Sequence, residues 1–128
     1  MNDRPLGYRV AVVDDDQRIL ESLKNLLESA DHAVRPFASA TALLDSGCLP
    51  EIDCLISDIG MPGMDGFQLL RAVQAVRPEL PVILITGHAD LLNQMSPVGL
   101  GEYRLFKKPF DGEELLTAIN DIGNGQVA

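Results

Sequence analysis

The chain has 128 residues, of which 46% are hydrophobic, and this is enough for a single domain with an ample core. Nineteen acidic residues against ten basic ones give a formal net charge of −9, which repels nucleic acid phosphates and anionic membrane surfaces, so we expect direct contact with neither. No apolar run approaches the roughly 20 residues that span a bilayer, and the N-terminus lacks a signal-peptide core, so we expect a cytoplasmic location.

Strand-like and helix-like segments alternate five times, which is typical of a parallel sheet with helices on both faces. In chain order, the first half predicts a strand at 9–13, a helix at 17–29, a strand at 33–37, a short helix from Ser39 through Leu44, and a strand at 53–57. Because Pro36 lacks an amide donor, the strand that contains it should lie at an edge of the sheet.

The second half begins with a loop at 60–66 that is too rich in glycine and proline for regular structure. Next in order come a predicted helix at 67–76, a strand at 82–85, a strand at 104–106, and a last helix that starts at Asp111 and ends near Asn120. Between the last two strands, Leu91 starts a helix that Pro97 should shorten. We expect one domain over 1–128, with its folded core at about 8–122 and residues 123–128 as a tail or the start of a linker.

Polar side chains mark the ends of four predicted strands. They are Asp14 and Asp15 after the first, Asp58 after the third, Thr86 after the fourth and Lys108 after the fifth. Because open parallel sheets bind ligands beyond the carboxyl ends of their strands, these groups should form one site. Three carboxylates a few ångströms apart stay ionised only if a cation joins them or some take up protons. Oxygen ligands of this number suit Mg²⁺.

This set of groups fits phosphoryl transfer, which needs positioning and charge neutralisation more than covalent chemistry. Lys108 supplies a second cation, and Thr86 supplies a hydroxyl donor for a phosphoryl oxygen. One carboxylate can act as the nucleophile and form an aspartyl phosphate. Asp58 is the best candidate because it stands alone on its strand, with the permissive Gly60 nearby.

Several other polar residues have simpler interpretations. Asp16 either joins the acidic group or caps the helix that follows, and both interpretations remain open. We expect His32 to be exposed and Lys107 to be a solvated surface charge. The two cysteines, Cys48 and Cys54, lack zinc-ligand partners, and we expect them to be buried or idle thiols.

Four motifs closely resemble the receiver domain of two-component response regulators, the CheY-like family. They are Val-Val-Asp-Asp-Asp at 12–16, Ser-Asp-Ile-Gly-Met-Pro-Gly-Met-Asp-Gly at 57–66, Ile-Thr-Gly-His at 85–88 and Lys-Pro-Phe at 108–110. The resemblance covers essentially the whole chain, and the residues of the second and third motifs are most similar to those of FixJ-type receivers. It implies a doubly wound, flavodoxin-like α/β fold whose five parallel strands have the order 2-1-3-4-5.

The resemblance also implies a role for each residue of the site. Asp58 would be the phosphoacceptor and, with Lys108, would catalyse the domain's own phosphorylation. The implied ligands of Mg²⁺ are Asp15, Asp58, the backbone carbonyl of Gly60, and Asp14, which acts mainly through bound water. Thr86 would hydrogen-bond the phosphoryl group and report its presence, while Lys108 would pair with it. The bond between Lys108 and Pro109 is expected to be cis.

One position departs from the family pattern. Receivers carry an aromatic residue three positions before the conserved lysine, and this residue swings inward on phosphorylation. Here that position holds Leu105. Tyr103 lies two residues earlier, on the same face of the predicted strand, and is the candidate to replace it.

The expected function is a phosphorylation-dependent signalling switch rather than an enzyme that acts on outside substrates. Its expected partners are a sensor histidine kinase or phosphotransfer protein, a downstream effector or C-terminal output domain that controls, for example, transcription, and a second copy on phosphorylation. One alternative is an aspartate-nucleophile phosphatase, which would carry an Asp-x-Asp pair where this chain has Gly60. The other is a receiver-fold interaction module that works without phosphorylation.

Overall fold

The computed structural model describes residues 7–87, 104–108 and 110–123. Its elements, in chain order, are β1 (Arg9–Val13), α1 (Gln17–Ser29), β2 (Ala33–Phe37), α2 (Ala40–Ser46), a short 3₁₀ turn η1 (Leu49–Glu51), β3 (Cys54–Asp58), α3 (Gly66–Val76), β4 (Val82–Thr86), β5 (Arg104–Lys107) and α5 (Gly112–Gly123). Four predictions concern residues outside the described ranges: those for Tyr103, the peptide bond to Pro109, the helix expected from Leu91, and the tail after Gly123.

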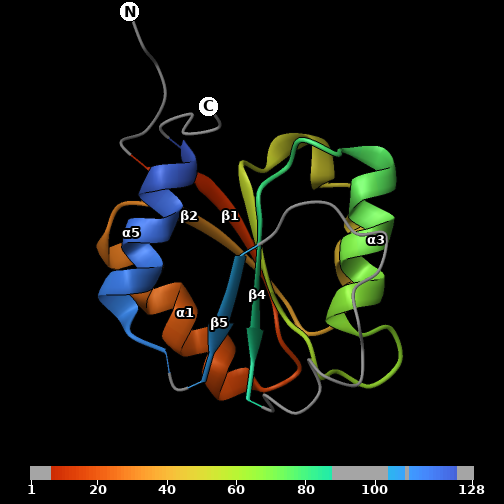
Figure 1. Ribbon diagram of the computed structural model, residues 1–128, viewed down its shortest axis with the longest axis horizontal. Coiled ribbons are helices and arrows are strands. Elements are labelled where there is room, and N and C mark those ends of the chain that lie inside the picture. The colour runs from red at the N-terminus through yellow and green to blue at the C-terminus, as the bar shows by residue number, and fades with distance from the viewer. Residues whose placement is uncertain (1–6, 88–103, 109, 124–128) are drawn as a thin grey trace, which may run out of the picture.

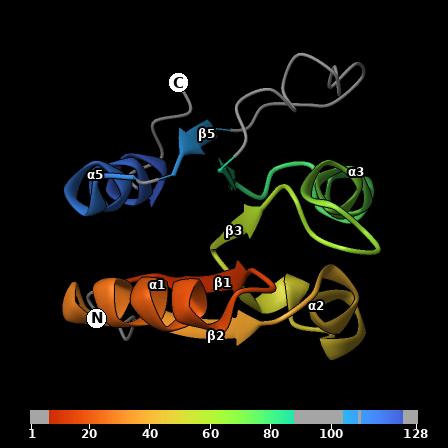
Figure 2. The same ribbon diagram turned by 90° about the horizontal axis from the view of Figure 1, so that it is seen from below.

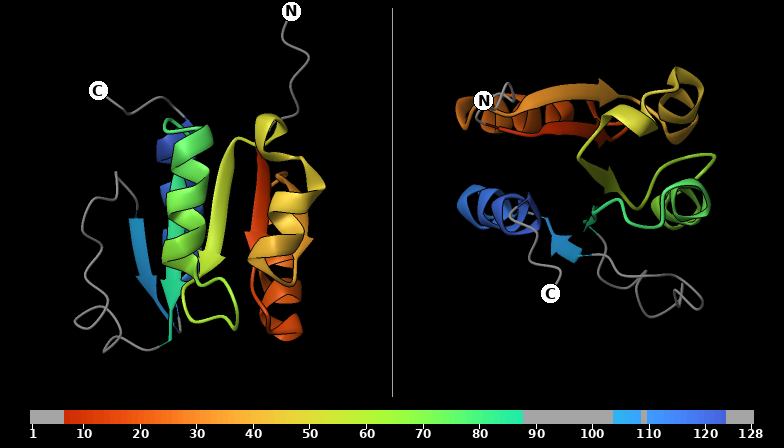
Figure 3. Two further views of the ribbon diagram at one scale, coloured as in Figure 1. Left: turned by 90° about the vertical axis from the view of Figure 1, so that its right-hand side faces the viewer. Right: turned by 90° about the horizontal axis from the view of Figure 1, so that it is seen from above.

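The strands form one parallel sheet in the order β2-β1-β3-β4-β5, as the sequence predicts (Figure 1). β2, with Pro36, lies at an edge of this sheet, where the missing amide donor is tolerated. Helices α1 and α5 cover one face of the sheet and α2 and α3 cover the other (Figures 2 and 3). The chain therefore has the doubly wound, three-layer architecture expected of alternating strands and helices.

Each face of the sheet buries its own apolar cluster. In β1, the side chains of Val10 and Val12 belong to the cluster under α1 and α5, whereas Ala11 and Val13 belong to the cluster under α2 and α3. This alternation is the two-residue period of a strand. The central strands β3 and β4 are buried along their whole length, which explains their continuous apolar runs.

Side-chain caps define the starts of the helices. Asp16 precedes α1 and accepts a hydrogen bond from the Arg18 amide at 2.9 Å, so its capping interpretation is confirmed. Asp65 and Gln68 form a reciprocal capping box at the start of α3. Asp111 likewise accepts a bond of 2.8 Å from the Glu113 amide at the start of α5. These bonds satisfy amides that have no partner inside their helices.

Most of the predicted bounds agree with the structure to within one or two residues. The two larger differences are the 3₁₀ turn η1, which was not expected, and α5, which continues to Gly123 rather than ending near Asn120. Leu115 and Ile119 are buried in the cluster shared with α1, and packing of this kind contributes more to helix stability than local propensity does. Both cysteines are buried free thiols, as predicted. None of the described helices reaches the length and apolarity that crossing a bilayer requires.

The prediction that His32 is exposed is wrong. Its side chain is only 5% exposed, and its Nδ1 atom accepts a hydrogen bond of 2.9 Å from the Tyr8 amide. The two rings stack with centroids 5.6 Å apart. His32 therefore ties the start of β1 to the turn between α1 and β2, and this role requires a ring without a proton on Nδ1.

We expect His32 to make the domain less stable in mild acid. Burial lowers the pKa of His32 below its usual 6.5, although the nearby Asp31 carboxylate opposes this effect. The unfolded chain therefore takes up a proton before the folded one does, and the free energy of unfolding falls as the pH drops below about 6.5. Urea unfolding at pH 7.5 and 5.5 measures this loss. His32→Asn keeps an acceptor near Nδ1 but cannot titrate, so its loss should be smaller; equal losses in both proteins contradict the assignment.

Candidate functional site

The carboxyl ends of the parallel strands bring the predicted polar residues together. Asp14 follows β1, Asp58 ends β3 and Thr86 ends β4, while Lys108 follows β5. The Lys108 amide donates a hydrogen bond of 2.7 Å to the Thr86 carbonyl oxygen, which joins the ends of β4 and β5. Side chains that are far apart in the sequence thus meet at one edge of the sheet.

Asp14, Asp15 and Asp58 form a compact group, which we call the acid cluster. One carboxylate oxygen from each residue lies within 4.8 Å of those from the other two. Asp14 and Asp58 are buried, at 2% and 7% exposure, whereas Asp15 is exposed. The Asp16 amide donates a bond of 2.9 Å to Asp14 Oδ1 and so holds this carboxylate in place. The cluster has one open side, at Asp15.

Lys108 bridges the two buried acids. Its Nζ atom lies 3.2 Å from Asp14 Oδ2 and 3.3 Å from Asp58 Oδ1. One ammonium group therefore contacts two of the three carboxylates, and it cannot neutralise the cluster alone. Lysine suits this position because its flexible stem can move a compact charge between neighbouring oxygens.

The pKa values reflect this imbalance. Burial, and then the Asp14 carboxylate, raises the pKa of Asp58, and this outweighs the opposing effect of Lys108. For Lys108, burial acts to lower the pKa, but the Asp58 and Asp14 carboxylates together raise it above 10.5. Asp58 thus carries a negative charge that its surroundings disfavour, and a further cation would relieve this cost.

The donor set of the acid cluster fits a magnesium ion. It offers only oxygen atoms, two from buried acids and one from an acid open to solvent. Mg²⁺ prefers carboxylate oxygens and keeps several of its waters, which an open side allows. Two negative charges remain when the three carboxylates are ionised and Lys108 is counted, and a divalent cation would balance them.

Two further predicted residues belong to the carboxyl ends of β4 and β3. Thr86 is buried, at 1% exposure, and is paired with Lys107 in the register of β4 and β5. Gly60 is exposed and lies two residues after Asp58, at the start of the loop to α3. Its carbonyl as a metal ligand and the Thr86 hydroxyl as a phosphoryl donor stay predictions.

Two groups that hold the backbone at Asp58 were not predicted from the sequence. The Ser57 hydroxyl donates a bond of 2.9 Å to the Asp58 carbonyl oxygen. Gly66, the first residue of α3, lies against the backbone of Asp58 and Ile59. The Asp-Gly pair at 65–66 could have indicated a close contact of this kind, but it is equally typical of a simple turn followed by a helix.

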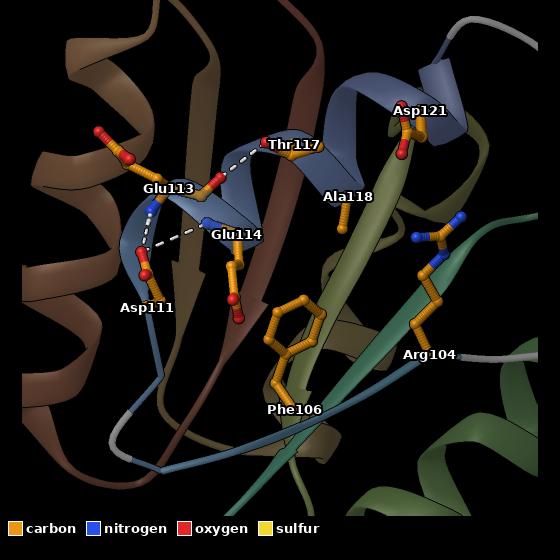
Figure 4. Close-up of a pocket in the computed structure, with 8 residues that line it drawn as sticks. All are labelled: Arg104, Phe106, Asp111, Glu113, Glu114, Thr117, Ala118 and Asp121. Atoms are coloured by element: carbon orange, nitrogen blue, oxygen red, sulfur yellow. Dashed lines mark hydrogen bonds between the residues drawn. The ribbon is translucent and has the colours of Figure 1, made fainter.

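A separate groove lies between β5 and α5 (Figure 4). It is lined by Arg104, Phe106, Asp111, Glu113, Glu114, Thr117, Ala118 and Asp121. It shares no residue with the acid cluster and contains a single basic side chain among four acidic ones. The groove is therefore a different surface from the candidate site.

Comparisons with known proteins agree with this geometry. The family model of the response regulator receiver domain matches residues 10–120. The transcriptional regulatory protein FixJ of Azorhizobium caulinodans is 37% identical over 115 residues, which are 90% of this chain and 54% of that protein. The chain thus spans about half the length of this relative.

Solved structures show the same fold. A response regulator receiver domain protein from Clostridium thermocellum has a TM-score of 0.82 at 32% identity, over 92% of this chain and 95% of that one. Full-length FixJ from B. japonicum has a TM-score of 0.78 at 34% identity, over 91% of this chain and 58% of that one. The chain therefore belongs to the response regulator receiver domain family, whose members are phosphorylation-dependent signalling switches and not conventional enzymes.

Proposed function

We propose that this domain accepts a phosphoryl group on Asp58 from a phosphohistidine of a sensor histidine kinase or phosphotransfer protein, in a Mg²⁺-dependent reaction. The observation that carries the proposal is the position of Asp58, whose carboxylate lies within 4.8 Å of the Asp14 and Asp15 oxygens and 3.3 Å from Lys108 Nζ. This arrangement supplies a nucleophile, a place for a metal ion and a mobile cation at one point.

Each group would take one part in the transfer. An Asp58 carboxylate oxygen forms a bond to phosphorus while the bond from phosphorus to the donor's imidazole nitrogen breaks, and that nitrogen keeps the electron pair. Lys108 then offsets the charge of the phosphoryl oxygens, and the Thr86 hydroxyl donates a hydrogen bond to one of them. Asp14, Asp15, Asp58 and the Gly60 carbonyl would hold Mg²⁺, which when bound neutralises charge on the phosphoryl group.

The output follows from a shift between two states of the domain. A phosphoryl group on Asp58 would draw Lys108 and Thr86 towards it, and the hydrogen bond between the Lys108 amide and the Thr86 carbonyl links both to the ends of β4 and β5. A ligand biases such an equilibrium only by its different contacts in the two states. Tyr103 is the proposed switch aromatic, because Leu105 is 38% exposed and lacks a ring.

The proposed setting is the cytoplasm, and the proposed output is control of transcription. FixJ is a transcriptional regulatory protein, and this chain matches only 54% of its length. We propose that the chain acts on a C-terminal output domain or a separate effector, with pairing of two copies on phosphorylation. Because this domain has a net charge of −9, which repels DNA phosphates, we expect that output partner to make any contact with DNA.

A direct test is incubation of the domain with Mg²⁺ and a small acyl phosphate, followed by intact mass measurement. We expect one labile phosphoryl adduct per chain, and none when a chelator removes the metal. An adduct that forms equally well with chelator contradicts the role of the metal. A protein that takes up no phosphoryl group would instead be an interaction module that works without phosphorylation. The exposed Leu105 favours that alternative, because it replaces the aromatic residue that a switch would use.

A further inference from the structure

Gly66 lies in a space that has no room for a side chain. A Cβ atom on Gly66 would come within 2.6 Å of the Asp58 carbonyl oxygen and 2.7 Å of Ile59 Cα. Both of these atoms belong to the backbone, so neither can move aside as the end of a flexible side chain would. The φ angle of Gly66 is not in the left-handed region, so space alone requires glycine at this position.

The contact at Gly66 is held from both sides. The Gly66 amide donates a hydrogen bond of 2.9 Å to the Ile59 carbonyl oxygen, and this bond closes the loop between β3 and α3. The capping box of Asp65 and Gln68 fixes the first turn of α3 against this loop. On the other side, the Ile59 amide donates a bond of 2.9 Å to the Ile85 carbonyl oxygen in β4. The backbone that follows Asp58 is therefore confined between β4 and α3.

We propose that Gly66 is a positioning residue for the acid cluster. Because it lacks a side chain, α3 can begin against the Asp58 carbonyl, and this contact sets the direction in which the Asp58 carboxylate points towards Asp14, Asp15 and Lys108. The inference rests on the proposed function, in which this carboxylate binds Mg²⁺ and accepts the phosphoryl group. It concerns the placement of Asp58 rather than the chemistry at Asp58.

The test compares Gly66→Ala with Gly47→Ala. Gly47 has a φ of 73° and no atom within 4 Å of an added Cβ, so alanine there strains the backbone without touching the site. In Gly66→Ala we expect the Mg²⁺ dissociation constant to rise roughly tenfold or more, as when a residue supporting a metal ligand is lost. The amide NMR signals of Asp58 and Ile59 should also shift in the metal-free protein. Gly47→Ala should lose stability but keep its Mg²⁺ affinity.

Each outcome has a distinct meaning. Unchanged Mg²⁺ affinity in a folded Gly66→Ala protein overturns the positioning role, as does an equal loss in Gly47→Ala. If Gly66→Ala does not fold, the double variant Asp65→Ala with Gln68→Ala replaces it, because it frees the start of α3 without adding an atom near Asp58. That variant should bind Mg²⁺ more weakly, and unchanged affinity overturns the role. A wild-type domain that neither binds Mg²⁺ nor takes up a phosphoryl group contradicts the proposed function instead.

Discussion

Asp58→Asn is expected to abolish the phosphoryl adduct and, in the absence of metal, to stabilise the fold by about 0.5–2 kcal/mol. The adduct is lost because the amide is not a nucleophile of the required kind. The stability rises because burial, and next the Asp14 carboxylate, disfavours the negative charge on Asp58 more than Lys108 favours it, as the raised pKa of Asp58 indicates. Intact mass measures the first effect, and thermal unfolding with a chelator present measures the second.

The pH dependence gives the sign of the Asp58 effect. A carboxyl group whose folded pKa lies above 3.8 favours the fold when it is protonated, and this contribution is lost as the pH rises through the folded pKa. The advantage of Asp58→Asn should therefore be full above the folded pKa of Asp58 and shrink as the pH falls towards 3.8. Asp16→Asn is the matched control, because it removes a neighbouring charge and keeps a good helix cap. Equal stabilisation by both substitutions contradicts a specific effect of the buried Asp58 charge.

Lys108→Ala is expected to separate metal binding from phosphoryl transfer. The rate of adduct formation should fall by about 10²–10³, the usual cost of removing one group that stabilises developing charge. Mg²⁺ binding should be kept or become tighter, because the ammonium that occupies Asp14 Oδ2 and Asp58 Oδ1 is gone. The time course of adduct formation at saturating Mg²⁺ and a calorimetric Mg²⁺ titration measure the two effects.

Lys107→Ala is the control for this pair of measurements. Lys107 is the exposed neighbour of Lys108 and forms the last position of β5, so its removal changes the net charge equally without touching the cluster. We expect it to alter neither the rate nor the affinity by more than about twofold, as for a screened surface charge. A Lys108→Ala protein that loses Mg²⁺ binding would assign the lysine to the metal site rather than to the phosphoryl group.

The elements of the fold could be predicted where they are encoded locally. The strand over Arg9–Val13 and the helix over Gln17–Ser29 have the predicted bounds, because a continuous apolar run and a helical repeat are properties of neighbouring residues. The position of β2 at the edge of the sheet follows from Pro36, whose backbone nitrogen carries no hydrogen to donate. The predicted end of α5 was three residues short, because the ends of helices are encoded less sharply than their periodic interiors.

The candidate site was predicted as a set of residues but not as a geometry. That Asp14, Asp15, Asp58 and Lys108 meet follows from the parallel sheet, since the strands end at one edge. Which oxygens Lys108 contacts could not be predicted, because it depends on the relative placement of side chains 94 residues apart. The same holds for Gly66, whose contact with Asp58 exists only once α3 is docked.

The order of strands and helices along the chain was thus determined by the sequence itself, through the periodicity of its apolar residues. The identity of the acids was determined by the polar residues at the ends of the strands. The tertiary structure alone decided the burial of His32, the bridging contacts of Lys108 and the close approach of Gly66 to Asp58. The physical reason is how far apart in the chain the interacting residues lie. Backbone periodicity is set by residues within a turn or a strand, whereas burial, pKa and steric fit are set by groups that only folding brings into contact.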